Sequence, residues 1–235
     1  MNIEIFTICW NEKLLLPQFY KWYKDRFPNA NFTVYDNISD DGSVELAKNL
    51  GMRVIPYNTE GQLKDSKYLE IKNNCWKGSE NWVIVCDVDE WLDINEHNLS
   101  VEDKRYVSLI KSCGYNMCNV NNETDFSKIK HGVRSVHYDK FVCFNSNKIK
   151  EINYTPGAHS IKPVGELKYS DLRYNLLHMK FLNEDYMVER YKNFKNRMSI
   201  ENRNNNWGVQ YLKEEEGIRT DYKNHLKASH NIYEQ

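Results

Sequence analysis

The sequence predicts an α/β protein in which helices flank a mostly parallel sheet. Short apolar segments alternate with helix-like segments through the first half of the chain, and polar residues follow the expected strand ends. Apolar residues make up 40% of the 235 residues, which is enough to build a sizeable core. Successive β-α-β units imply parallel strands joined by right-handed crossovers.

The alternation continues up to Asp89. The expected strands are residues 3–9, 32–35, 53–57 and 82–88, and the expected helices are residues 12–26, 43–50 and 65–76. In the first helix, Leu15, Phe19, Trp22 and Tyr23 recur at helical spacing. Residues 82–88 are apolar almost throughout, which is typical of a strand covered on both faces.

The pattern changes after Asp89. Residues 101–112 predict a helix, and residues 115–120, 138–144, 149–154 and 173–179 predict strands without full helices between them. A mixed or antiparallel extension of the sheet fits this order. From residue 183 the chain is expected to be helical again. The prediction is therefore an α/β domain over residues 1–182 and a helical extension over residues 183–235, packed on the same domain.

Composition and charge narrow the possible partners. Charged residues make up 28% of the chain but leave a formal net charge of −1, which argues against a dedicated nucleic-acid binder. The six cysteines form no C-x-x-C pair, and the chain has no signal peptide and no apolar run long enough to span a membrane. These features predict a soluble cytoplasmic protein with reduced thiols, and they leave its oligomeric state open.

The expected helix after residue 183 has two faces. Met187, Tyr191, Phe194 and Met198 recur at helical spacing and are expected to pack on the domain. The opposite face is expected to carry four basic residues, namely Arg190, Lys192, Lys195 and Arg197. Solvation is the simpler expectation for that face. The alternative is a surface that meets an anionic acceptor or touches a membrane peripherally.

An acidic turn follows the fourth expected strand. Asp87, Asp89 and Glu90 come directly after the apolar residues of that strand. Ligands of open α/β sheets bind at the carboxyl ends of strands, and carboxylates gathered there need a positive partner. Hard divalent cations prefer such oxygens and commonly bridge to phosphates. We therefore expect Asp87 and Asp89 to hold Mn²⁺ or Mg²⁺, provided that the chain turns between them.

A second polar loop follows the second expected strand. Residues 36–43 lead into the start of a helix, where Asp40 and Asp41 are expected to cap open backbone amides. Asp36 comes first in this loop, and we expect it to contact a base or a ribose hydroxyl of a ligand.

These motifs together resemble the family-two glycosyltransferases of GT-A fold, in particular a branch of small bacterial and viral members. The resemblance covers residues 1–200 or so. It rests on Asn11-Glu12, Asp36-Asn37-Ile38-Ser39-Asp40-Asp41-Gly42-Ser43, residues 71–76, the run from Trp82 to Glu90, Pro156-Gly157-Ala158-His159, Leu176-Leu177-His178-Met179-Lys180 and Glu189-Arg190-Tyr191.

The resemblance implies a metal-dependent transferase. Its donor would be a nucleotide-diphosphate sugar, UDP- or dTDP-linked, and its acceptor a glycan or a lipid-linked sugar. Transfer would invert the anomeric carbon. The donor would be contacted by Asn11, Glu12 and Asp36.

Two histidines are further candidates for the site. His178 ends an apolar strand, so we expect it to complete the metal site with Asp87 and Asp89. Lys180 follows two residues later and is expected to reach a donor phosphate. His159 is assigned a catalytic role near the acceptor, although the two histidines could exchange roles.

The catalytic base is not fixed by the sequence. Glu184 and Asp185 resemble an acidic pair that opens a late helix in many family-two enzymes, but acids are also ordinary at a helix start. Glu123 and Asp125 are rival candidates.

Two other functions stay open. A metal-dependent nucleotidyltransferase would also use paired carboxylates, although residues 7–12 lack the glycines of a phosphate loop. A non-catalytic sugar-binding module on the same fold is the other alternative.

Overall fold

The computed structural model describes residues 3–234, and it confirms the α/β fold class. The first sheet has six strands, in the order β3 (Arg53–Pro56), β2 (Asn31–Asp36), β1 (Ile3–Cys9), β4 (Trp82–Val85), β9 (Cys143–Asn145) and β6 (Leu109–Ile110). Strands β3, β2, β1 and β4 run parallel, while β9 lies antiparallel to both β4 and β6. The β-α-β alternation of the sequence therefore produces the parallel part of this sheet.

A second sheet has five strands, in the order β13 (His230–Asn231), β8 (His131–Arg134), β7 (Ser112–Cys118), β12 (Tyr174–Phe181) and β5 (Glu90–Leu92). Strands β7 and β12 are parallel, and the other pairs are antiparallel. Strands β10 (Ile149–Glu151) and β11 (Val164–Gly165) form a separate hairpin-like pair. The later strands thus build a sheet of their own in addition to the antiparallel edge of the first sheet.

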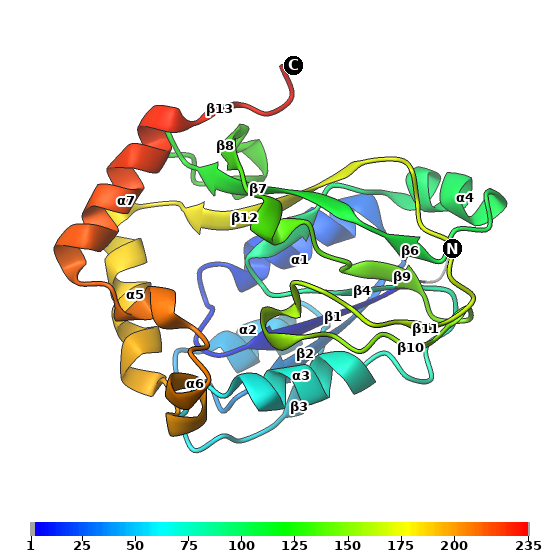
Figure 1. Ribbon diagram of the computed structural model, residues 1–235, viewed down its shortest axis with the longest axis horizontal. Helices are drawn as coiled ribbons and strands as arrows, with labels where there is room; N and C mark the ends of the chain where they lie inside the picture. The colour runs from blue at the N-terminus through cyan, green and yellow to red at the C-terminus, as the bar shows by residue number, and fades with distance from the viewer. Residues whose placement is uncertain (1–2, 235) are drawn as a thin grey trace.

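Seven α-helices surround the sheets over residues 3–234. They are α1 (Leu16–Arg26), α2 (Ser43–Asn49), α3 (Asp65–Asn74), α4 (Glu96–Lys104), α5 (Glu184–Arg197), α6 (Ile200–Asn204) and α7 (Glu215–Ala228). Short 3₁₀ turns are η1 (Phe126–Lys128), η2 (Val136–Tyr138), η3 (Pro156–Ala158) and η4 (Val209–Leu212). Figure 1 shows α5, α6 and α7 together along one side of the molecule.

Two expected elements differ in the structure. The helix predicted for residues 101–112 is wrong, because α4 starts earlier and ends at Lys104. Asn95 and Asn98 cap its start reciprocally, and the chain from Leu109 onward pairs with strands. The strand predicted for residues 138–144 is also largely wrong, because Tyr138 ends a 3₁₀ turn and pairing begins only at Cys143.

The C-terminal helices pack on the second sheet. A buried apolar cluster joins Cys118 of β7 and Phe181 of β12 to four helical residues, namely Met187, Tyr191, Ile218 and Tyr222. The last strand, β13, then pairs with β8 and so returns the chain to the same sheet. The division of the chain into residues 1–182 and 183–235 stays a prediction.

Two further sequence expectations can be compared with the structure. All six cysteines lie within the described residues, and each is a free thiol. Among the helices of residues 3–234, none combines the length and the apolar character that crossing a membrane requires.

Candidate functional site

The acidic turn forms where β4 ends. The Glu90 amide donates to the Asp87 carbonyl oxygen at 2.9 Å, so the chain reverses between the two residues. The Trp91 indole N–H donates to the Val88 carbonyl at 2.9 Å, and the Met179 amide of β12 donates to the Asp89 carbonyl at 2.8 Å. The turn that the sequence required for Asp87 and Asp89 is therefore present at the end of β4, and it is held by bonds from β5 and β12 of the second sheet.

Helix α1 supports this turn from behind. The buried Tyr23 hydroxyl donates to the Glu90 carbonyl at 3.2 Å and accepts from the Leu92 amide at 2.8 Å. The Trp22 indole N–H donates to the Leu92 carbonyl at 3.1 Å. Because these aromatic residues belong to the apolar stripe of α1, core packing and positioning of the acidic residues depend on the same helix face.

Basic side chains from distant segments neutralise the acidic residues. Lys72 of α3 lies 2.7 Å from an Asp87 carboxylate oxygen, and the side chain of Lys72 is only 6% exposed. The Lys140 ammonium donates to Glu90 at 2.5 Å, with both side chains buried.

Arg190 of α5 contacts two acids at once. Its guanidinium donates to Glu12 at 2.7 Å and to Asp89 at 3.1 Å. The expectation of a solvated basic face is therefore wrong for Arg190. It is also wrong for Arg197, which is buried, stacks on Trp10 at 3.2 Å and donates to the Gly61 carbonyl.

These contacts set the charge state of the turn. Burial alone would raise the pKa of Asp87, but Lys72 and Lys140 outweigh it and hold that pKa below its usual value. Burial also opposes ionisation of Asp89, yet His178 in its protonated form and Arg190 lower the pKa of Asp89. Both carboxylates are therefore ionised at neutral pH.

His178 of β12 lies beside Asp89. Its Nδ1 is 2.8 Å from the Asn116 side-chain oxygen, which only accepts, so Nδ1 carries the proton and Nε2 has a free lone pair. Nε2 is 3.5 Å from an Asp89 carboxylate oxygen. Burial lowers the pKa of His178 even though Asp89 opposes that shift, so the imidazole is neutral at pH 7.

The pair of Asp89 and His178 suits a divalent cation. One atom of each is free to coordinate, and Asn116 orients the imidazole as the outer partner of a metal-bound histidine does. Each of the two carboxylates already has a basic partner, Lys72 for Asp87 and Arg190 for Asp89. Within residues 3–234, no group of three or more His, Cys, Asp or Glu residues is close enough to hold a metal ion. The metal role of Asp87, Asp89 and His178 stays a prediction.

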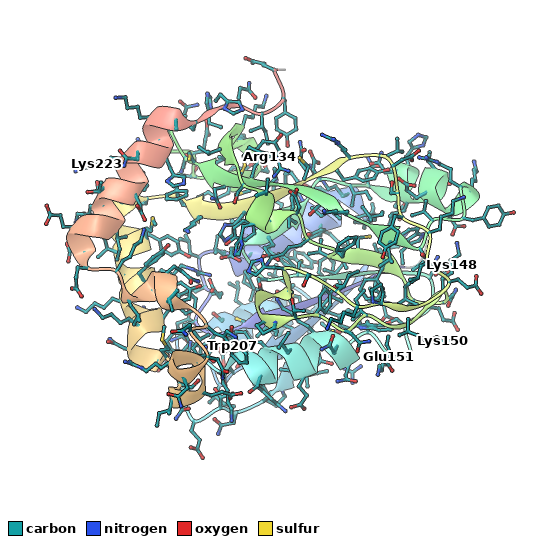
Figure 2. All side chains as sticks on the ribbon, viewed as in Figure 1. Arg134, Lys148, Lys150, Glu151, Trp207 and Lys223 are labelled. Atoms are coloured by element: carbon teal, nitrogen blue, oxygen red, sulfur yellow. The ribbon has the colours of Figure 1, made fainter. Side chains whose placement is uncertain are left out.

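A first cavity of about 350 Å³ opens in front of the turn. Its walls come from the ends of β1 and β4, from α3, from residues 156–159 and from residues 206–211. Residues that line it include Trp10, Glu12, Tyr68, Lys72, Asp87, Asp89, His159, His178, Arg190 and Trp207. Trp207, labelled in Figure 2, lies between α6 and the start of α3.

His159 lines the first cavity at its 3₁₀ turn. Its Nδ1 is 2.9 Å from the His137 carbonyl oxygen, so Nδ1–H donates and Nε2 keeps its lone pair. The two imidazoles stack with ring centroids 3.6 Å apart. Burial, with the nearby charge of Lys140, lowers the pKa of His159 to about 3. The structure therefore presents a neutral imidazole to the cavity.

Three expected donor-binding residues lie elsewhere. Both carboxylate oxygens of Asp36 accept from Ser39, at 2.9 Å from its amide and 2.6 Å from its hydroxyl, and Asp36 is buried and does not line the first cavity. Asn11 is tied to Asp40 by two hydrogen bonds. Lys180 lines a second cavity rather than the first. Donor contact by these residues stays a prediction.

The capping predicted in the loop after β2 is present at Asp41. Its side chain accepts from the Ser43 amide at 2.9 Å and from the Lys13 amide at 3.0 Å.

The other base candidates do not line the first or the second cavity. Glu184 and Asp185 pair with Arg219 of α7, and Asp125 accepts from the Ser127 amide.

Comparisons with known proteins give structural matches of low TM-score and no match to a family model or a curated sequence. No protein-family model and no curated protein sequence matches this chain. The structure is similar to the 1–349 chain of S. aureus TarS, with a TM-score of 0.48 and 10% identity over 84% of this chain and 66% of that chain. A longer S. aureus TarS chain gives a TM-score of 0.47 and 10% identity, over 81% of this chain and 40% of that chain.

Another similar structure is glucosyl-3-phosphoglycerate synthase from Mycobacterium tuberculosis, in a complex with Mn²⁺ and UDP. Its TM-score is 0.33 and its identity 18%, over 48% of this chain and 44% of that chain. The TarS 1–349 chain has itself been crystallised with UDP and with UDP-GlcNAc. This chain spans less than two thirds of each of these proteins. At these TM-scores and identities, the donor, the acceptor and the site residues are argued from this chain's own side chains.

Proposed function

We propose that this chain transfers a sugar from a nucleotide-diphosphate sugar, UDP- or dTDP-linked, to a glycan or lipid-linked acceptor. The observation that carries the proposal is the first cavity, where an ionised acidic turn at the carboxyl end of β4 faces Lys72 and Arg190. Ligands of α/β sheets bind at such edges. The motif resemblance of the acidic turn and of the loop after β2 points to the same donor class.

The first cavity has places for both ends of the donor. Trp10, Tyr68 and Trp207 are among its lining residues, and their aromatic rings suit a nucleoside. Lys72 and Arg190 line the part next to the turn, where their charges favour a diphosphate. The guanidinium of Arg197 covers one face of Trp10 at 3.2 Å, and this contact holds the indole in place.

A divalent ion would be held by Asp89 and His178, with Asp87 as the third residue once it releases Lys72. Bound there, Mn²⁺ or Mg²⁺ would supply neutralisation of the charge that develops on the leaving diphosphate. Arg190 contributes to the same neutralisation from the protein side, because its guanidinium already lies 3.1 Å from Asp89.

His159 is the proposed base in the transfer step. The acceptor hydroxyl oxygen bonds to the anomeric carbon while the bond from that carbon to the diphosphate oxygen breaks, and the nucleoside diphosphate leaves. The hydroxyl proton passes to Nε2 of His159, whose lone pair is left free by the contact of Nδ1 with the His137 carbonyl. Nε2 of His159 is unprotonated at neutral pH, while its pKa of about 3 makes the imidazole a weak base, so the free lone pair and its place in the cavity support this role and its basicity does not.

A donor panel tests the proposal. The protein is incubated with UDP- and dTDP-sugars, with Mn²⁺ or with EDTA, and the products are separated. Release of nucleoside diphosphate and free sugar is the expected result, and it should fall at least tenfold in Asp89→Asn. Asp103→Asn, which alters an exposed carboxylate on α4, is the matched control.

Other products would point to other functions. Pyrophosphate exchange with a nucleoside triphosphate would identify a nucleotidyltransferase. Binding of sugar nucleotides without any turnover would identify a binding module. Absence of binding by every donor, measured by thermal shift, would reject the proposal outright.

A further inference from the structure

A second cavity of about 250 Å³ adjoins the first. It lies between β12, α5 and η4, and it shares Asp89, His178 and Arg190 with the first cavity. A ligand in the second cavity would therefore meet the proposed donor site at the acidic turn. Its volume is below the usual range for small-molecule pockets, which suits one sugar unit better than a whole nucleotide.

Lys180 is the unpaired charge of this cavity. Within residues 3–234 no carboxylate forms an ion pair with it. Its ammonium lies 5.4 Å from the ring centroid of Phe181 and 5.6 Å from that of Tyr191. The half-buried Lys180 thus sits against aromatic faces that attract a cation without neutralising it.

The remaining lining is positive or neutral apart from one carboxylate. That carboxylate is Asp89, and Arg190 and His178 already contact it. Neutral hydrogen-bonding groups and aromatic rings complete the wall, among them Asn116, Ser135, Tyr138, Gln210 and Tyr211. Aromatic faces with amide and hydroxyl groups suit a sugar ring, and an unpaired ammonium suits an anion.

We infer that the second cavity binds the acceptor, and that the acceptor sugar carries a carboxylate or a phosphate that pairs with Lys180. This inference rests on the proposed function, because it takes the first cavity as the donor site. It reassigns Lys180 from the donor phosphate to the acceptor anion, since Lys180 lines only the second of these two cavities.

Binding of small probes in the presence of the donor product tests this inference. The first cavity is filled with saturating UDP or dTDP, and glucose, glucuronate and glucose 6-phosphate are then titrated by calorimetry or ligand-detected NMR. At least one anion is expected to bind roughly ten- to a hundredfold more tightly than glucose, the range for a hydrogen bond to a charged group. A preference for glucuronate would identify the acceptor as a sugar acid. A preference for glucose 6-phosphate would identify it as a sugar phosphate.

Variants connect the preference to Lys180. Lys180→Gln should abolish the preference for the anion, and Lys180→Arg should retain most of it. Lys192→Gln, which removes an exposed charge from the neighbouring helix α5, should leave the preference unchanged.

Several results would overturn the inference. The first is that the anions and glucose bind equally well. The second is that the preference for the anion survives in Lys180→Gln. The third is that Lys180→Gln loses as much affinity for UDP or dTDP as it loses for the anion. If neither nucleoside diphosphate binds the wild-type protein, the proposed function fails as well. Normal nucleotide binding without an anion preference rejects the acceptor assignment alone.

Discussion

Lys72→Met removes the ammonium that lies 2.7 Å from Asp87 while keeping a side chain of similar length. The contact shows an internal cation in the place where the sequence predicts a metal ion. Burial would lower the pKa of Lys72, but Asp87 and Glu90 reverse this and raise it, so the ammonium stays charged at neutral pH. In the variant, the Asp87 carboxylate loses its partner and must be satisfied by water or by an added cation.

The burial of each ion pair sets the expected loss of stability. Breaking a fully buried pair costs about 3–5 kcal/mol, which we expect for Lys140→Met because Glu90 and Lys140 are 2% and 3% exposed. The Asp87 side chain is 34% exposed and can be hydrated from the cavity, so Lys72→Met should cost about 1–3 kcal/mol. Lys67→Met breaks an exposed pair on the same helix and should cost at most about 1 kcal/mol.

Denaturant unfolding in the presence of Mn²⁺ or EDTA measures the stability loss of each variant. It also shows whether Lys72 and a metal ion compete for Asp87. If Lys72 and a metal ion share Asp87, Mn²⁺ should stabilise Lys72→Met more than the wild type. At a hundred times its dissociation constant, the ion would add about 2.7 kcal/mol. Equal effects of Mn²⁺ on wild type and variant would refute the competition. A Lys72→Met loss as large as that of Lys140→Met would refute the burial argument.

Three other changes test the site. If Asp36 contacts the nucleoside, Asp36→Ala should weaken UDP or dTDP binding by about 1.5–3 kcal/mol, as measured by calorimetry. A loss of stability with normal nucleotide binding would mean that Asp36 acts only through its hydrogen bonds with Ser39. Gly157→Ala should reduce transfer but not UDP or dTDP binding, because at its φ of 72° an added Cβ would come within 2.5 Å of the His159 ring. The pKa of His159 is about 3, against 6.5 in the unfolded chain, so the unfolded state binds more protons between these pH values. Wild-type stability should therefore fall as pH drops from 6.5 to 3, and His159→Gln should flatten that slope in pH-dependent unfolding.

Local pattern was enough to predict the parallel part of the fold. Each strand from β1 to β4 has an apolar centre and is separated from the next by a helix, so the carboxyl ends of β1 and β4 had to meet at one edge. The acidic turn follows directly from that placement. The second sheet could not be predicted in the same way, because β5 and β13 are three and two residues long and pair with strands distant in sequence.

The basic partners of the turn were missed for a different reason. Lys72, Lys140 and Arg190 belong to three separate segments of the chain, and no local pattern joins them to the acidic turn. A signal existed for Arg190, which lies three residues after Met187 and four before Phe194 and so shares the inward face of α5. The expectation of a solvated face followed from the positive charge of Arg190, whereas its helical spacing from Met187 and Phe194 indicated the inward face.

Arg190 also affects the order in which the site is completed. Its hydrogen bond to Glu12 closes a sequence separation of 178 residues, and its bond to Asp89 closes one of 101 residues. Chains grow from the N-terminus, and contacts between distant residues form late because loop closure costs entropy. During synthesis, Glu12 and Asp89 therefore emerge long before the guanidinium that neutralises them. The proposed ligand site becomes electrostatically complete only when α5 docks, so we expect folding of the body to precede ligand binding.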